Sequence, residues 1–148
     1  MSWKQWLAKG DIKGHQTSKQ ELDNLRALIA RDLADAAIVG LSADRRFATA
    51  YNAALQSGTI AIACSGYRVS ARAGHHKITF EAAALAIGPK AVALTDYFDA
   101  RRRKRNVIDY MNSSVATETE ADELVHKANE FHKLVESWLT TTHPTLAG

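Results

Sequence analysis

Residues 117–138 read TETEADELVHKANEFHKLVESW, and they carry the strongest periodic signal in the chain. Thr117 and Glu120 form a capping-box pattern at the start, and the acidic first turn suits the positive end of a helix dipole. The apolar residues that follow recur at intervals of three and four, which places them on one helix face: Ala121, Leu124, Ala128, Phe131, Val135 and Trp138. The stretch predicts a long amphipathic helix in a bundle or along a helix–helix seam.

Two further long helices are predicted upstream by the same spacing. Ser18 and Glu21 form a capping-box pattern, and Ser42 is a good N-cap for a second helix. Gly40 and Gly66 are natural ends for the two helices. The first predicted apolar face consists of Leu22, Leu25, Ile29, Leu33 and Ala36, and the second of Phe47, Tyr51, Leu55, Gly58 and Ile62. We interpret Tyr51 as a core aromatic whose hydroxyl is hydrogen-bonded rather than as a catalytic group.

The rest of the chain continues the helical pattern. Residues 79–87 predict a short helix closed by Gly88 and Pro89, and another helix is expected from Lys90. No strand pattern, repeat or glycine-rich phosphate loop is present in the sequence. The fold class is therefore expected to be all-α, an antiparallel four- to five-helix bundle.

Length and composition are typical of one soluble globular domain. The chain has 148 residues, of which 46% are hydrophobic and 24% charged. We expect a peripheral N-terminal segment (1–17), a helical domain (18–140) and a frayed tail (141–148). The N-terminus lacks the apolar core of a signal peptide, the apolar run at residues 60–64 is far too short to span a bilayer, and Cys64 is the single cysteine. These features indicate a cytoplasmic protein without membrane contact.

Residues 101–110 read RRRKRNVIDY and are the first candidate for function. A block of basic residues is most often a solvated face, and that interpretation suits Arg102, Arg103 and Lys104. Arg105 differs, because the apolar spacing of the preceding residues continues to it, and a charge on an inward stripe must be paired or serve a site. The formal net charge is only +3, so the local patch carries more information than the total.

Residues 66–78 form the one long polar connection, and connections of this length in a compact domain are often functional. The connection contains Arg68 and the adjacent pair His75 and His76. Adjacent histidines diverge on a helix, and the chain lacks the Cys/His or His-Glu-x-x-His spacing of zinc sites. We expect no metal and no cofactor, and the histidines are candidates for acid–base work or for capping the next helix.

Four features, in this order, resemble the HEPN superfamily (higher eukaryote and prokaryote nucleotide-binding) over about residues 18–140. Residues 45–54, RRFATAYNAA, resemble its alanine- and tyrosine-rich second helix, and residues 66–76 resemble the connection after that helix. Residues 105–110, RNVIDY, are similar to the family signature, which is an arginine, often an asparagine, a few further residues and then a histidine. The capped helix from Thr117 resembles the closing helix. The likeness is nearest to a bacterial subgroup in which an Asp-Tyr pair follows the arginine.

The resemblance implies an α-helical bundle, usually a homodimer whose two signature motifs face each other across a cleft. Many members are metal-independent ribonucleases in toxin–antitoxin, abortive-infection or CRISPR systems, and others partner minimal nucleotidyltransferases or bind nucleotides. Here Tyr110 occupies the histidine position. RNA cleavage without metal needs a base for the 2′-hydroxyl, and an unperturbed tyrosine, with a pKa near ~10, is a poor base at neutral pH.

Three functions follow as hypotheses. The first is a dimeric module that binds RNA or nucleotide phosphate through Arg68, Arg101, Arg102, Arg105 and Asn106. The second is a metal-independent endoribonuclease toxin with catalytic candidates Arg105, Asp109, Tyr110, His75 and His76. The third is a non-catalytic protein partner of a nucleotidyltransferase-type antitoxin. We also expect the apolar face of residues 121–138 to exceed what one bundle covers, which favours a homodimer.

Overall fold

In the computed structural model, helices account for most of residues 1–110 and 114–148, the residues that the structure describes; for residues 109 and 110 it describes the backbone alone. The elements in chain order are α1 (Trp3–Lys9), β1 (Ile12–Gly14), α2 (Lys19–Ala36), α3 (Ala43–Cys64), β2 (Tyr67–Val69), α4 (His75–Ile87), α5 (Pro89–Tyr110), α6 (Glu118–Thr142) and a final 3-10 turn (Pro144–Leu146). The all-α expectation is confirmed. No helix in the described part of the chain is long and apolar enough to cross a membrane.

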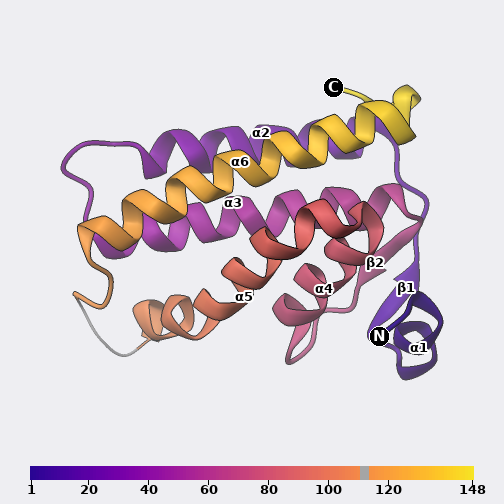
Figure 1. Cartoon of the computed structure of the whole chain (residues 1–148), viewed down its shortest axis with the longest axis horizontal. Helices are drawn as coiled ribbons and strands as arrows, with labels where there is room; N and C mark the ends of the chain where they lie inside the picture. Colours follow the sequence, from indigo (N-terminus) through magenta and orange to yellow (C-terminus); the bar gives the residue numbers. More distant parts are fainter. Residues whose placement is uncertain (111–113) are drawn as a thin grey trace.

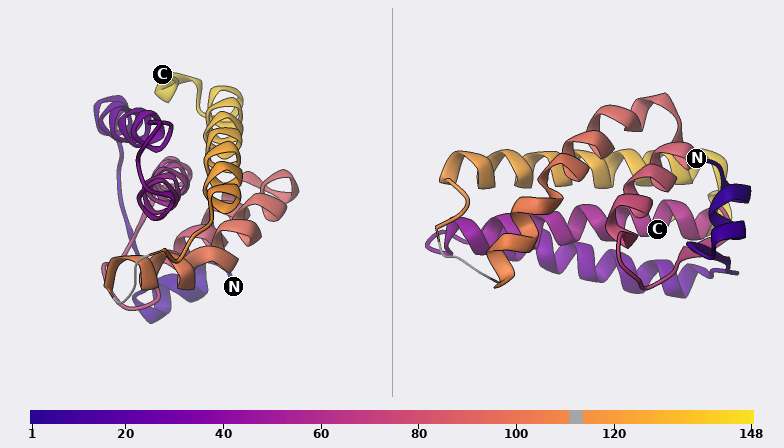
Figure 2. Two further views of the ribbon diagram at one scale, coloured as in Figure 1. Left: turned by 90° about the vertical axis from the view of Figure 1, so that its left-hand side faces the viewer. Right: turned by 90° about the horizontal axis from the view of Figure 1, so that it is seen from below.

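The helices form two layers. The helices α2, α3 and α6 lie side by side along the long axis of the molecule (Figure 1), and α3 packs against both of the others. Consecutive helices α2 and α3 run antiparallel, whereas α6 runs in the same direction as α3. The antiparallel hairpin of α4 and α5 crosses below this layer, as both further views show (Figure 2), and packs on α3. The second layer is the one that carries the candidate residues.

The periodic face of α6 is buried within one chain. Ala121, Leu124, Ala128, Phe131 and Val135 have no exposed surface, and Trp138 is half-buried. This face packs mainly against α3, with further contacts to α2 and α5, in a core that includes Phe47, Phe80 and Phe98. The apolar face therefore does not exceed what the bundle covers, and it gives no argument for a second copy.

The N-caps of α2, α3 and α6 are the residues predicted from the sequence, and one capping box is incomplete. Thr117 forms the full capping box with Glu120, and Ser42 accepts a hydrogen bond from the backbone of α3. Ser18 accepts one from the Glu21 amide, but the Glu21 carboxylate does not return to the cap. It accepts hydrogen bonds from the hydroxyl of Thr17 and the ring of His15 instead.

Two features of the second layer differ from the sequence-based expectation. The connection after α3 contains β2, which pairs antiparallel with β1, so the molecule has a small two-stranded sheet. Helix α4 begins at His75 rather than at Thr79, so both histidines belong to a helix and not to a loop. The sheet places α1 beside this layer, where Trp6 is almost fully buried.

The two ends of the chain both contact the bundle. Residues 1–17 hold the buried Trp6 and the paired strand β1. Near the other end, the Arg26 guanidinium of α2 donates hydrogen bonds to Glu136 of α6 and to the carbonyl of Leu146. The Leu146 carbonyl therefore lies against α2.

Candidate functional site

A cavity of about 340 Å³ opens between the start of α4 and the last turns of α5. We call it the cationic pocket. It brings together five of the candidate residues, which are separated by some thirty positions in the sequence. Its lining consists of Ala73, Gly74, His75, His76, Arg102, Arg105 and Asn106.

The start of α4 is shaped by a glycine turn. Gly74, the N-cap, has φ 82°, in the left-handed region that a residue without Cβ enters readily. The turn places the carbonyl of Arg72 where it accepts hydrogen bonds from both the amide and the ring Nδ1 of His75 (3.1 and 2.8 Å). The first amides of a helix have no partners within it and carry the positive end of its dipole. The start of α4 therefore adds to the positive potential of the pocket.

Arg105 is positioned by α3. Its Nη2 donates a hydrogen bond of 3.1 Å to Oδ1 of Asn52, and its guanidinium carbon lies 5.9 Å from the centre of the Tyr51 ring. Asn52 was not among the residues that the sequence singled out. These contacts hold the planar guanidinium at the edge of the pocket, with the side chain partly buried.

His76 is neutral at physiological pH. Burial, followed by the positive charges of His75, Arg105 and Arg102, lowers its pKa to about 4. Burial also raises the pKa of the fully buried Tyr51 well above its usual range, so its hydroxyl keeps its proton. The Tyr51 hydroxyl and Nδ1 of His76 are joined by a hydrogen bond of 3.2 Å. The expected hydrogen bond of the Tyr51 hydroxyl is present.

The tautomer of the neutral His75 ring is fixed by a backbone carbonyl. Its Nδ1 donates to the Arg72 carbonyl, because a carbonyl oxygen can only accept. In the neutral ring Nε2 is then an acceptor. The two rings lie edge to face with their centres 4.4 Å apart. The acceptor Nε2 of His75 therefore lies at the cationic pocket.

Arg101 and Arg68 do not line the cationic pocket. Arg101 covers the ring of Tyr97, with its guanidinium carbon 3.4 Å from the ring centre, and its Nη2 lies 3.5 Å from Glu123 of α6. Lys104 likewise pairs with Glu120 of α6. Arg68 borders a smaller cavity on the other side of His75. The side chains of Asp109 and Tyr110 lie outside the described residues.

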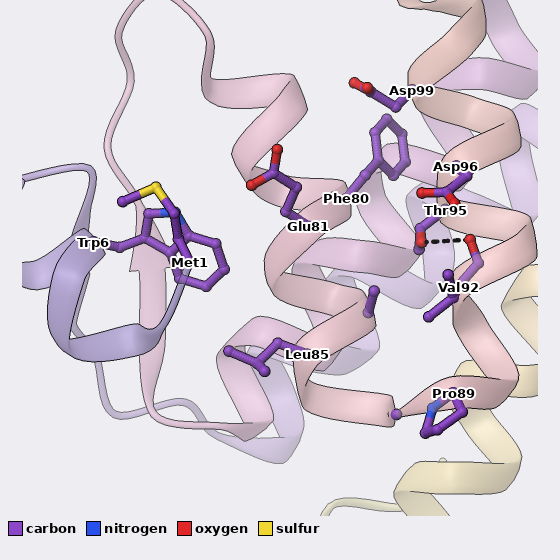
Figure 3. A pocket seen from close by; sticks show the side chains of 12 residues that line it. Met1, Trp6, Phe80, Glu81, Leu85, Pro89, Val92, Thr95, Asp96 and Asp99 are labelled. Carbon is purple, nitrogen blue, oxygen red and sulfur yellow. Dashed lines mark hydrogen bonds between the residues drawn. The ribbon is translucent and has the colours of Figure 1, made fainter.

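The larger cavity along the same two helices has the opposite charge. It has a volume of about 560 Å³, and Glu81, Asp96 and Asp99 lie around it (Figure 3). We call it the acidic cavity. Its apolar walls include Phe80 and Leu85. Three carboxylates repel a phosphate, so its greater size does not make it the better candidate for an anionic ligand.

No metal site is evident. Within residues 1–108 and 114–148, no group of three or more histidine, cysteine, aspartate or glutamate side chains is placed to hold a metal ion. The lining of the cationic pocket supplies guanidinium groups, two imidazole rings and the amides at the start of α4.

Comparison with known proteins identifies the family. The family model described as HEPN_SAV_6107-like HEPN matches residues 37–136, about two thirds of the chain. The chain belongs to the HEPN superfamily. The matched region extends from the end of α2 to most of α6, so it contains Asn52, both histidines and Arg105. No curated protein and no solved structure matches the chain. Membership in the HEPN superfamily indicates a nucleotide- or RNA-related function.

Proposed function

We propose that this HEPN protein binds RNA or a nucleotide through phosphate groups held in the cationic pocket. The observation that carries the proposal is the convergence of Arg102, Arg105 and the start of α4 on one cavity. Candidates chosen from two separate segments of the sequence line the same space, which a merely solvated basic face would not require.

The lining fits a phosphate in both charge and shape. A guanidinium offers planar paired donors that match phosphate oxygens, and helix N-termini bind anions through their unpaired amides. Arg105 is held by Asn52 before any ligand arrives, so little side-chain ordering remains to oppose binding.

The electrostatics favour binding over cleavage. A general acid–base group works best when its pKa lies near the working pH, and that of His76 lies about three units lower. Burial, together with the cations that attract phosphate, keeps this imidazole unprotonated. Burial holds Tyr51 in its neutral form, so it does not act as the base either.

The family resemblance suggests the biological setting. We propose that the protein acts as a homodimer in a bacterial toxin–antitoxin or defence system, with a nucleotidyltransferase-type antitoxin as a candidate protein partner. Light scattering at micromolar concentration tests the assembly, and a monomer mass would contradict it.

The binding test compares Arg105→Ala with Arg103→Ala. Arg103 is exposed, lies in the same basic run and borders neither cavity. We expect Arg105→Ala to weaken binding of a fluorescein-labelled RNA oligonucleotide by about tenfold to hundredfold, since a charge-assisted hydrogen bond contributes about 1.5–3 kcal/mol. Arg103→Ala should change it by less than about twofold.

Two controls keep this test interpretable. Arg105→Lys retains the charge but lacks the planar fork, so an intermediate affinity is expected. Circular dichroism melts show whether loss of the contact to Asn52 unfolds the variant. Equal losses for Arg103→Ala and Arg105→Ala, each following only the salt concentration, would contradict a specific site.

Metal-independent endoribonuclease activity is the second candidate function, and the tautomer of His75 favours it. An acceptor Nε2 beside Arg102 and Arg105 has the arrangement of a base next to phosphate-binding groups. Labelled RNA incubated with chelator separates the two functions. Cleavage by the wild type that is lost in His75→Ala but kept in His126→Ala, an exposed histidine of α6, would establish the nuclease.

A further inference from the structure

A small apolar cavity of about 160 Å³ lies beside the cationic pocket. Three elements contribute to it, and three of its seven side chains are aliphatic. They are Leu55, Thr59 and Ile62 of α3, Arg68 and Val69 of β2, and His75 and Thr79 of α4. The apolar cavity thus lies where the small sheet meets the two helices.

The two spaces share one wall. His75 lines both the apolar cavity and the cationic pocket, and it is the one residue common to the two linings. A ligand that reached from one space into the other would pass along this ring. It would need a charged group at one end and an uncharged group at the other.

The two threonine hydroxyls of the apolar cavity already donate hydrogen bonds within the protein. Thr59 donates its hydroxyl hydrogen to the carbonyl of Leu55 (3.1 Å), and Thr79 donates to the carbonyl of His75 (2.8 Å). Both threonines therefore have no hydroxyl donor left for a ligand. The aliphatic side chains and the two threonines together favour an uncharged, largely apolar group.

Arg68 supplies a flat cationic surface at the same cavity. Its side chain is exposed, and it makes no hydrogen bond or ion pair with any residue that the structure describes. A guanidinium that is not fixed by a carboxylate can lie over an aromatic ring, and this contact is one that proteins use to hold bases. The size agrees, since about 160 Å³ equals the liquid volume of roughly five water molecules and suits one small ring system.

We infer that the apolar cavity is a nucleobase subsite, so that a single nucleotide binds with its phosphate in the cationic pocket and its base between Arg68 and the aliphatic wall. This inference rests on the proposed function of the cationic pocket. It assigns Arg68 a separate role from Arg102 and Arg105, because it contacts the base rather than the phosphate. With no hydroxyl donors left in the cavity, recognition is by stacking and shape, and it discriminates weakly among bases.

The test compares uridine 5′-monophosphate with ribose 5-phosphate by calorimetry. The two ligands carry the same phosphate and differ in the base. Stacking a base raises affinity by about tenfold to hundredfold, so the wild-type protein should bind uridine monophosphate more tightly by that factor. Thr59→Trp fills the cavity from its exposed rim, and the ratio of the two affinities should then fall to about one.

Arg68→Ala is a second variant that leaves the helices intact. It should lower the affinity ratio severalfold, whereas the control Arg45→Ala, an exposed arginine near the start of α3, should leave the ratio unchanged. Equal wild-type affinities for the two ligands, or a ratio that survives both Thr59→Trp and Arg68→Ala, would overturn the base subsite and leave the phosphate site standing. Absence of binding by both ligands would overturn the proposed function itself, and this inference with it.

Discussion

The cationic pocket and the acidic cavity lie along the same pair of helices and have opposite chemistry. The acidic cavity is larger, about 560 Å³ against about 340 Å³, and its walls are more apolar. By size and apolar lining alone it would be the default ligand site. Its three carboxylates exclude phosphate, whereas the smaller pocket combines two arginines with the start of α4. Charge, rather than volume, is therefore the property that makes the cationic pocket the better candidate for binding phosphate.

The two regions meet at one ion pair. Asp99 lines the acidic cavity, Arg102 lines the cationic pocket, and Asp99 Oδ1 lies 3.5 Å from Arg102 Nε. Asp99 and Arg102 are three positions apart on α5, so about one helical turn separates the negative cavity from the positive pocket. The predictions below test whether the two regions are functionally as distinct as their charges indicate.

The largest effect is expected from introducing the histidine of the family signature at position 110. The family signature that residues 105–110 resemble has histidine at the position of Tyr110, whose side chain lies outside the described residues. We expect wild-type protein to cleave RNA weakly or not at all without metal. Tyr110→His should raise cleavage by up to about 10²–10⁴-fold, the range typical of one general acid–base group. Labelled RNA incubated with chelator measures the gain.

Two further variants test whether the gain in cleavage depends on the cationic pocket. Leu85→His puts an imidazole in the acidic cavity, where Leu85 is 45% exposed, and it should give no cleavage because no cation holds phosphate there. The double variant Arg105→Ala with Tyr110→His should lose the gain. Cleavage by Leu85→His equal to that of Tyr110→His would show that the two regions are not distinct.

A smaller effect is expected in the pH dependence of stability. The folded-state pKa of His76, about 4, lies below its unfolded value near 6.5. Between these values the unfolded chain binds more protons, so the free energy of unfolding falls as the pH falls from about 6.5 towards 4. A shift of this size corresponds to at most about 3 kcal/mol, and about 1–2 kcal/mol is expected because the ring is only partly buried.

His76→Gln should remove that part of the pH dependence. Glutamine keeps an acceptor for the Tyr51 hydroxyl but does not titrate. Urea unfolding at pH 7.5 and 5 measures the change, with the exposed His126→Gln as the matched control. His132, whose pKa burial also lowers, contributes the same background to both variants. If the two variants lose stability equally on acidification, the folded protein does not lower the pKa of His76.

The spacing of apolar residues along the sequence was sufficient to predict the long helices. It did not reveal features that depend on backbone conformation or on contacts between distant segments. The face from Ala121 to Val135 is periodic because each residue contacts the same core, so three- and four-residue spacing reveals it. The early start of α4 was missed because Gly74 caps the helix through its backbone conformation and makes no side-chain cap. Strands of three residues, as in β1 and β2, are too short to show alternation.

The candidate site was predicted in part for the same reason. Arg105 was singled out by its place on the inward stripe, and Arg102 was named as a binding candidate within the basic run. Asn52 lies 53 positions from Arg105, and only packing of α5 on α3 brings them together. Arg101 was grouped with Arg102 as a ligand contact. One residue turns a helix by about 100°, so Arg101 faces α6 while Arg102 faces α4. The sequence alone does not contain the direction from which α6 approaches.

The smallest effect is expected at the junction of the two regions. The side chains of Asp99 and Arg102 are each 33% exposed, and such ion pairs contribute about 0.2–1 kcal/mol. Asp99→Asn removes the carboxylate that competes with phosphate for Arg102, so phosphate affinity should rise about twofold to threefold at low salt and return to the wild-type value as salt screens the pair. Asp96→Asn is the matched control, because Asp96 lines the same cavity, makes no ion pair with the described residues and changes the net charge equally. Isothermal titration with inorganic phosphate at two salt concentrations measures both variants. An equal rise for Asp96→Asn would assign the effect to overall charge, and no rise for Asp99→Asn would mean that Arg102 does not contact the phosphate.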